Sequence, residues 1–481
     1  MQMGVAAIGG KDSMSGSFRD LNVPPTLVSF AVATADAGSI ISPEFKTPEN
    51  RVLFVPLKRD SSGMPDFRVV NKTFRRIAEL IAQKRVLSAK TVRIGGVAAA
   101  VSTMAFGNRI GFEFMPEISR EQLFRPDHGS IVMELAPGEN LDVVMDGVEY
   151  VLLGVTRKTP AVSVMGASIS LDAARKAWET PLEKVFPTAS EQGNEMASFK
   201  PFPGPVVMGK AKKPIARPRI IIPVFPGTNC EYDSARAFEE AGGNPETLII
   251  RNLSARDIEE SVDAMAKAID RAQILLLPGG FSAGDEPDGS GKFIAAFFHS
   301  PKLTDAVTRF LNERDGLILG ICNGFQALIK LGLLPYGEIR SLASDSPTLT
   351  FNRIGRHMSR MVETRVVSGL SPWLGLVRPG EVHTIAISHG EGRLAANRDH
   401  LERLAANGQI ATQYVNAEGN PSMDIVANPN GSDWAIEGIT SPDGRILGKM
   451  GHSERIGRYV AINVPGSKNQ RIFAAGVQYF R

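Results

Sequence analysis

The sequence predicts an α/β protein in which an α+β domain precedes a domain with a doubly wound, mostly parallel sheet. Two observations lead to this prediction. After residue 218, short continuous apolar runs alternate with helix-like segments, whereas before residue 186 strands and helices follow in a more mixed order. A strand that is buried on both faces is apolar throughout, and regular alternation with helices favours parallel pairing.

Between these two parts, a segment without a regular apolar period is rich in Pro, Gly, Ser and Lys. Such composition is typical of a linker between domains. We therefore expect three parts, namely a first domain at residues 1–185, a linker at 186–217 and a second domain at 218–481.

In the first domain, the predicted elements are strands and one long, mostly helical segment. Strands are expected at residues 25–36 and 51–57, the helical segment at 67–89, and further strands at 129–135, 148–156 and 161–166. This order indicates an α+β unit.

The second domain begins with a predicted buried strand at 220–225 and a helix at 230–243, whose closing glycine pair suits a C-terminal cap. A strand at 247–250 follows, and then a helix at 254–272 in which Ser254 and Asp257 have the spacing of a capping box. Two more buried strands are expected at 274–280 and 316–321. Sheets of this kind bind ligands at the carboxyl ends of their strands, where Pro-Gly-Gly (278–280) and Cys322 both fall.

The overall composition is that of an ordinary globular protein. Of 481 residues, 43% are hydrophobic and 22% are charged, and the net charge is +3. No apolar run approaches a membrane span and no basic patch stands out, so we expect neither a membrane nor a nucleic-acid partner. Two cysteines and no secretory leader predict a cytoplasmic protein without a disulfide framework. Since the chain opens inside what looks like strand and loop, it has either an irregular terminus or the start of a fragment.

Cys322 lies in the sequence Gly-Ile-Cys-Asn-Gly, directly after an apolar strand and before a helix-like stretch. This pattern is typical of a nucleophile elbow, in which flanking glycines allow a sharp turn and the side chain projects above the sheet. The following helix directs its first amides at the sulfur, which lowers a thiol pKa. The alternative is a buried cysteine that acts as a small apolar residue.

Of the chain's seven histidines, His452 is the preferred partner for this thiol. Glu454 follows two residues later, and side chains at this spacing share a face of extended backbone. The carboxylate can therefore orient the imidazole, which completes a Cys–His–Glu triad. The alternative is a solvated loop.

The Pro-Gly-Gly segment offers unblocked backbone amides near the elbow. Together with the amide of Asn323, it can form an oxyanion hole, although a plain tight turn is the alternative for the segment taken alone. Cys230 has no elbow around it and is predicted to be structural. No metal site is predicted.

Several motifs of residues 218–481 together resemble one family. They are GICNGFQAL, LLLPGGFSAGDEPDGSGKF, ISHGEGR, NPNGS and MGHSER. This part of the chain is similar to the class I glutamine amidotransferase domain of the formylglycinamide ribonucleotide amidotransferases, which act in purine biosynthesis. The resemblance implies that the triad is Cys322, His452 and Glu454, and that glutamine and the oxyanion contact Gly279, Gly280, Asn323 and Gln326.

The first domain resembles the second aminoimidazole ribonucleotide synthetase-like unit of the same family, through GGKDSMSGSF and GGVAAAVSTMAFGNRIGFEF. Residues 9–16 are predicted to form a glycine-lysine loop suited to phosphate, with Gly10, Lys11 and Ser13 as candidates, although a simple turn is the alternative. Where the family often has an Asp-rich stretch, this chain has Thr91, Arg93 and Ile94. A metal–nucleotide site there is therefore doubtful.

The resemblance implies an ATP-dependent carbon–nitrogen ligase that takes ammonia from glutamine, with ATP and Mg²⁺ as cofactors of the complete enzyme. The first synthetase-like unit and the beginning of the second are expected to be absent, so this chain alone is expected to act only as a glutaminase. Glutamine is the expected substrate, and formylglycinamide ribonucleotide and ATP would bind through the absent N-terminal half. A free-standing cysteine hydrolase and a non-catalytic scaffold fragment are the alternatives.

Overall fold

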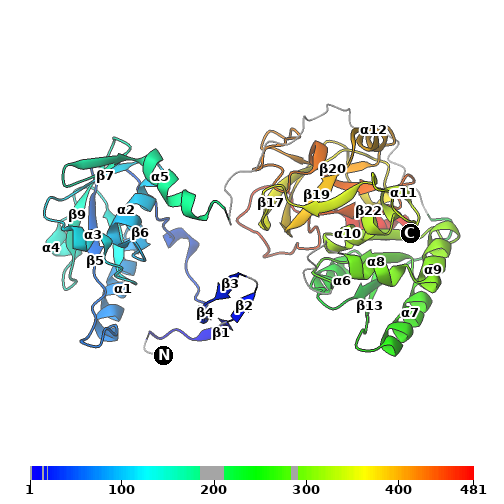
Figure 1. Ribbon diagram of the computed structural model, residues 1–481, viewed down its shortest axis with the longest axis horizontal. Coiled ribbons are helices and arrows are strands. Elements are labelled where there is room, and N and C mark those ends of the chain that lie inside the picture. Colours follow the sequence, from blue (N-terminus) through cyan, green and yellow to red (C-terminus); the bar gives the residue numbers. More distant parts are fainter. Residues whose placement is uncertain (1–2, 14–15, 19, 185–210, 283–290) are drawn as a thin grey trace. The chain divides into compact units, whose positions relative to one another are not determined.

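The computed structural model describes residues 3–13, 16–18, 20–184, 211–282 and 291–481. The chain divides into two compact units, Met1–Lys184 and Val185–Arg481 (Figure 1). Most of the predicted linker, residues 186–210, lies outside the described residues. Among the described residues, no helix is both long and apolar enough to cross a membrane.

The first unit is built around a seven-stranded sheet with strand order β11-β10-β7-β9-β5-β8-β6. Its strands are β5 (Arg51–Val55), β6 (Val86–Thr91), β7 (Gly111–Phe114), β8 (Ile131–Leu135), β9 (Val151–Arg157), β10 (Ala161–Val164) and β11 (Ala167–Ser170). Its α-helices are α1 (Phe67–Ala82), α2 (Gly96–Phe106), α3 (Arg120–Phe124), α4 (Leu141–Val144) and α5 (Leu171–Glu179). Only β10 and β7 pair in parallel among these neighbours, so the predicted α+β class is confirmed.

Helix α1 shows how the local sequence sets one of these elements. The side chain of Asp66 accepts hydrogen bonds from the amides of Arg68 and Val69, which satisfies donors that the first turn leaves free. Val70, Ile77 and Leu80 recur at helical spacing and are buried, and Ile77 and Leu80 belong to one core cluster with residues of the sheet. The predicted helical segment 67–89 therefore ends as helix at Ala82 and continues as strand β6.

The N-terminal residues of the first unit form two small hairpins. Strand β1 (Ala7–Ser13) pairs antiparallel with β4 (Thr26–Ala31), and β2 (Gly16–Phe18) pairs with β3 (Leu21–Val23). The prediction that residues 9–16 form a loop is thus wrong for Gly10, Lys11 and Ser13, because these residues lie in β1. Antiparallel pairing with β4 holds this segment extended, with Gly10 opposite Ser29.

The second unit contains a nine-stranded sheet with strand order β13-β12-β14-β15-β22-β21-β20-β17-β18. Its strands are β12 (Arg219–Val224), β13 (Asn244–Ile249), β14 (Ile274–Leu277), β15 (Leu317–Ile321), β17 (Met358–Val366), β18 (Val382–His389), β20 (Ile410–Val415), β21 (Ile436–Thr440) and β22 (Ile446–Lys449). A separate pair is formed by β16 (Thr348–Phe351) and β19 (Glu391–Ala395). The α-helices are α6 (Glu231–Glu240), α7 (Ala255–Ile269), α8 (Lys292–Phe298), α9 (Pro301–Asn312), α10 (Asn323–Lys330), α11 (Leu333–Tyr336), α12 (Arg398–Ala406) and α13 (Ile472–Tyr479).

The predicted α/β class of this unit is confirmed, and every strand predicted in it is present. From β13 to β22 all neighbours pair in parallel. From β22 to β18 they pair antiparallel, so the sheet continues into an antiparallel half beyond the predicted strands. The predicted start of the helix at 254 is also confirmed, since the Ser254 hydroxyl accepts the amide of Asp257.

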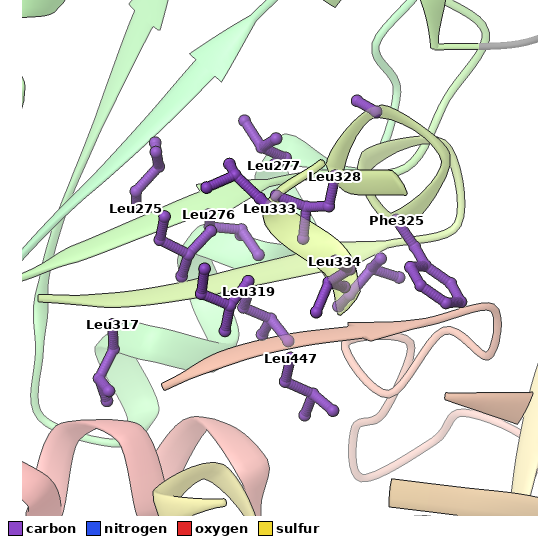
Figure 2. Packing of buried hydrophobic residues seen from close by; sticks show 14 of the residues in the cluster. Leu275, Leu276, Leu277, Leu317, Leu319, Phe325, Leu328, Leu333, Leu334 and Leu447 are labelled. Carbon is purple, nitrogen blue, oxygen red and sulfur yellow. The ribbon is translucent and has the colours of Figure 1, made fainter. Parts of the chain in front are cut away.

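Among the parallel strands, β14, β15 and β22 are held by apolar packing. Figure 2 shows leucines of β14, β15 and β22 packed against side chains of α10 and α11. All residues of β14 and β15 are buried. Because each fully buried leucine contributes about 1.5–3 kcal/mol of transfer free energy, this cluster holds the end of β15 rigidly where α10 begins.

Candidate active site

Cys322 lies in the junction between strand β15 and helix α10 and is the residue directly before the helix. Its backbone has φ 52° and ψ −106°, which is a strained conformation for a residue with a side chain. The Cys322 amide donates to the carbonyl of Lys449 at 2.9 Å, and the Cys322 carbonyl accepts the amide of Gln326 at 3.0 Å. The sharp strand–turn–helix of a nucleophile elbow is therefore present.

The two glycines around this turn have a different role from the predicted one. The positive φ falls on Cys322 itself and not on Gly320 or Gly324. A β-carbon at Gly324 would lie 1.9 Å from the carbonyl oxygen of Leu277, and one at Gly320 would lie 2.5 Å from a methyl group of Leu328. These glycines thus allow α10 to pack tightly against β14 and β15.

His452 and Glu454 form a buried hydrogen-bonded pair. Nδ1 of His452 lies 2.6 Å from Oε1 of Glu454, and the two side chains are 2% and 0% exposed. The amide of His452 donates to the carbonyl of Ala386 at 2.8 Å, which fixes the loop after β22 against β18. The predicted pairing of these two residues is therefore present.

The electrostatics of the pair favour a charged imidazole. Burial alone would lower the pKa of His452, but the carboxylate of Glu454 and the thiols of Cys230 and Cys322 act in the opposite direction and raise this pKa well above its ordinary value. Burial alone would likewise raise the pKa of Glu454, whereas His452 and Arg455 lower it. An imidazolium at this position can act as a proton donor beside Cys322.

Gly279 lies beside both His452 and Cys322. A β-carbon built on this residue would lie 2.8 Å from Cε1 of His452 and 3.5 Å from Cβ of Cys322. The imidazole and the thiol therefore meet beside the Pro-Gly-Gly segment, as the sequence predicts. The next residue, Gly280, has φ 145° and bridges to Thr228.

Asn323 and Gln326 lie on the first turn of α10 and are almost fully buried. The Asn323 side chain accepts the amide of Ser282 at 3.3 Å and donates to Gln326 at 3.1 Å. The side-chain amide of Gln326 donates to the main-chain carbonyl of Glu391 at 2.5 Å. Both side chains thus connect the elbow to neighbouring loops. The Asn323 main-chain amide, at a helix N-terminus, has no acceptor within the helix and can serve an oxyanion.

Cys230 is the residue that the sequence reasoning missed. Its sulfur lies 3.8 Å from Nδ1 of His452, accepts from Arg455 at 3.4 Å and contacts Oδ1 of Asn229 at 3.1 Å. It would also lie 3.1 Å from a β-carbon on Gly279. Cys230 is therefore part of the wall of the site, and the two cysteines of the chain flank one glycine. No sequence signal identifies it, because 222 positions separate it from His452.

Cys230, His452 and Glu454 are also the group of possible metal ligands found within the described residues, with ligand atoms within 4.8 Å of one another. The 2.6 Å contact between His452 and Glu454 leaves no space for an ion between them. The positively charged guanidinium of Arg455 also donates a hydrogen bond to the Cys230 sulfur, which disfavours a cation there. The arrangement is thus better suited to proton transfer than to metal binding.

The Ser-His-Gly-Glu-Gly-Arg motif forms another wall of the site. The Cys322 sulfur lies 3.9 Å from the carbonyl oxygen of Ser388. His389 is buried and its pKa is lowered to about 3, first by burial and then by His452 and His357. A base with this pKa is neutral near pH 7, so His389 is not the charged partner of the thiol. Residues 283–290 of the Pro-Gly-Gly motif lie outside the described residues.

The phosphate candidates of the sequence belong to the first unit. Gly10, Lys11 and Ser13 lie in β1. The side chain of Ile94, between β6 and α2, is 83% exposed.

Two relatives and one solved structure are similar to the second part of this chain. A relative named phosphoribosylformylglycinamidine synthase subunit PurQ, from Salinibacter ruber, is 35% identical over 237 residues, which are 49% of this chain and 87% of the relative. A subunit of the same name from Gloeobacter violaceus is 35% identical over 250 residues, 52% of this chain and 93% of the relative. A solved structure described as PurLQS from Thermotoga maritima shares 27% identity and a TM-score of 0.40, and the match covers 55% of this chain and 100% of that chain.

A family model also matches the part of the chain that contains the nine-stranded sheet. Residues 217–480, which are more than half of the chain, match the model of the CobB/CobQ-like glutamine amidotransferase domain. The chain therefore belongs to the CobB/CobQ-like glutamine amidotransferase family.

Proposed function

We propose that the chain is the glutamine amidotransferase part of phosphoribosylformylglycinamidine synthase, and that it hydrolyses glutamine at Cys322 to supply ammonia in purine biosynthesis. Two observations support this proposal. The two relatives named above, most of whose length matches this chain, are subunits of that synthase. In addition, Cys322, His452 and Glu454 converge beside Gly279. The convergence is the single observation on which the mechanism depends most.

In the first half of the reaction, the Cys322 thiolate attacks the carboxamide carbon of glutamine. The negative charge that develops on the carboxamide oxygen is stabilised by main-chain amides, with Gly280 and Asn323 as the candidates. His452 then donates a proton to the departing nitrogen, so that ammonia leaves and a glutamyl thioester remains on Cys322. Glu454 stabilises the imidazolium and holds the ring by its Nδ1–H.

In the second half, water releases glutamate. Neutral His452 removes a proton from a water molecule, the resulting hydroxide attacks the thioester carbonyl, and the thiolate leaves. The strained backbone of Cys322 keeps the sulfur above the sheet throughout both steps.

Ammonia is consumed by a ligation step. In the proposed whole reaction, ammonia replaces the formyl amide oxygen of formylglycinamide ribonucleotide in an ATP-dependent step. Thr91, Arg93 and Ile94 provide no carboxylate at the position where the related family often has an acidic stretch, so these residues do not fit Mg²⁺. The proposal also includes a synthetase-like partner unit and a cytoplasmic location. It sets the domain limits at 1–185, 186–217 and 218–481.

The proposal is tested by glutamate release from glutamine in the purified chain and in Cys322→Ala. We expect wild-type release to depend on glutamine and to vanish in Cys322→Ala, while circular dichroism of the two proteins coincides. Equal glutamate release by both proteins would remove Cys322 from the mechanism.

A further inference from the structure

A buried ion pair lies beside the two catalytic segments without taking part in the proposed chemistry. Nζ of Lys449 lies 3.1 Å from Oε1 of Glu437, and the side chains are 1% and 0% exposed. Removing two charges from water carries a large penalty, and replacing such a pair by apolar residues is often neutral or stabilising. Stability alone is therefore a poor explanation for a charged pair at this position.

The side chains of this pair hold both polar groups of Gly451, the residue before His452. The amide of Gly451 donates to Oε1 of Glu437 at 2.6 Å. Nζ of Lys449 donates to the carbonyl oxygen of Gly451 at 2.8 Å. A β-carbon on Gly451 would lie 2.9 Å from Glu437 and 3.0 Å from Lys449, so the two side chains enclose this residue closely.

These contacts fix the orientation of the catalytic histidine. The carbonyl of Gly451 and the amide of His452 belong to one planar peptide group. Lys449 holds its carbonyl end, and the carbonyl of Ala386 accepts its amide end at 2.8 Å. With the peptide plane held at both ends, the direction of the His452 side chain is set.

The same pair reaches the nucleophile through the main chain. The carbonyl oxygen of Lys449 accepts the amide of Cys322 at 2.9 Å. On the other side, Oε2 of Glu437 accepts the hydroxyl of Thr412 at 2.5 Å, which anchors the pair to strand β20. Lys449 is therefore hydrogen-bonded to both segments that must meet for proton transfer.

We propose that the Glu437–Lys449 pair is a positioning unit that fixes the distance between Cys322 and His452. This proposal rests on the proposed function, in which those two residues act on glutamine. Because neither Glu437 nor Lys449 contacts the reacting atoms in the mechanism above, their removal should impair the chemical step and leave glutamine binding intact.

The test compares Lys449→Met, Glu437→Gln and the apolar double variant Glu437→Leu/Lys449→Met with wild type. A misplacement of about 1 Å can reduce a rate by roughly 10²-fold, so we expect kcat for glutamine hydrolysis to fall about 10–100-fold with KM unchanged. The double variant removes both charges together, which keeps the comparison valid if a single variant leaves one charge unpaired and fails to fold.

Gln409→Met is the matched control. Gln409 is also a buried polar residue, but its side-chain amide bonds to the carbonyls of Pro335 and Thr440 and not to a catalytic segment. We expect this variant to retain the wild-type kcat. An equal loss of kcat in Gln409→Met and Lys449→Met would show a general effect of destabilisation and overturn the proposal.

A second readout does not require glutamine. Iodoacetamide modifies thiolates, and peptide mass spectrometry gives its rate at Cys322 separately from Cys230. We expect slower modification of Cys322 in all three pair variants, because His452 is then no longer held beside the sulfur that it activates. Wild-type rates in the folded double variant would overturn the positioning role. If the wild-type chain does not hydrolyse glutamine, the proposed function is refuted. The modification rates of Cys322 still test the positioning role of the pair in that case.

Discussion

Adding one methyl group at Gly279 is a direct test of how the catalytic groups pack. In Gly279→Ala, the new β-carbon would lie 2.8 Å from Cε1 of His452, 3.1 Å from the Cys230 sulfur and 3.5 Å from Cβ of Cys322. Carbon atoms pack optimally at about 3.5–4.0 Å, so the imidazole must move by on the order of 1 Å. The backbone of Gly279 is outside the left-handed region, and the substitution therefore acts through this contact and not through backbone strain.

The expected size of the effect follows from this displacement. A shift of about 1 Å in a catalytic group corresponds to a loss of roughly 10²-fold in kcat, which is about 2.7 kcal/mol of activation free energy. Overpacking in a tight interior costs about 1–3 kcal/mol of folding stability, so the variant should still fold. We expect kcat for glutamine hydrolysis to fall much more than the melting temperature would suggest.

The assay is glutamate release under saturating glutamine, with thermal unfolding measured on the same samples. Gly38→Ala is the matched control, because Gly38 belongs to the first unit and a β-carbon on it would meet only Oδ1 of Asp36, at an ordinary contact distance of 3.5 Å. We expect Gly38→Ala to behave as wild type. A wild-type kcat in Gly279→Ala would refute the packing of His452 against this glycine.

Three further results are expected. His452→Ala should lower kcat by about 10²–10⁴-fold and Glu454→Gln by less, since an orienting residue acts one step removed; loss of activity in His389→Ala with activity retained in His452→Ala, in the same assay, would move the triad to His389. The pKa of His389 is lowered from 6.5 to about 3 in the folded chain. Between these pH values the unfolded chain binds a proton at this residue and the folded chain does not. The free energy of unfolding should therefore fall as the pH decreases through this window. His389→Gln should lose less stability from pH 6.5 to 4 in urea unfolding, and equal slopes for both proteins would contradict this. With formylglycinamide ribonucleotide, ATP, Mg²⁺ and ammonium, the chain alone should form no amidine product by mass spectrometry, because Ile94 cannot ligate a metal; product formation would locate a synthetase site within these residues.

The parts of the fold that could be predicted from sequence are those with local signals. The central parallel strands β14 and β15 contain no polar side chain and are fully buried, and Ser254 has the capping spacing of a helix start. The antiparallel half gives no such signal. Strand β20 is buried along its whole length yet contains Thr412 and Gln413, whose polar groups are satisfied by Glu437 and by the carbonyl of Trp434. Because these polar residues find their partners far away in the sequence, β20 shows neither an apolar run nor an alternating pattern.

The same distinction separates the predicted from the missed residues of the site. Cys322 lies between a strand and a helix, and His452 and Glu454 are neighbours in sequence, so local reasoning is sufficient for them. Cys230 and Glu437 reach the site only through the order of strands in the sheet. Residues 9–13 show the opposite error, since glycine and lysine suggested a phosphate loop where pairing with β4 imposes a strand.

The central claim is that glutamine forms a covalent intermediate on the sulfur of Cys322, with Cys230 only supporting the site. A glutamine analogue with a diazoketone in place of the carboxamide alkylates the thiol that attacks this position, and peptide mass spectrometry identifies the labelled residue. We predict labelling of Cys322 alone, protection by glutamine, and strongly reduced labelling in His452→Ala. Labelling of Cys230, or labelling of Cys322 that glutamine does not slow, would contradict the account.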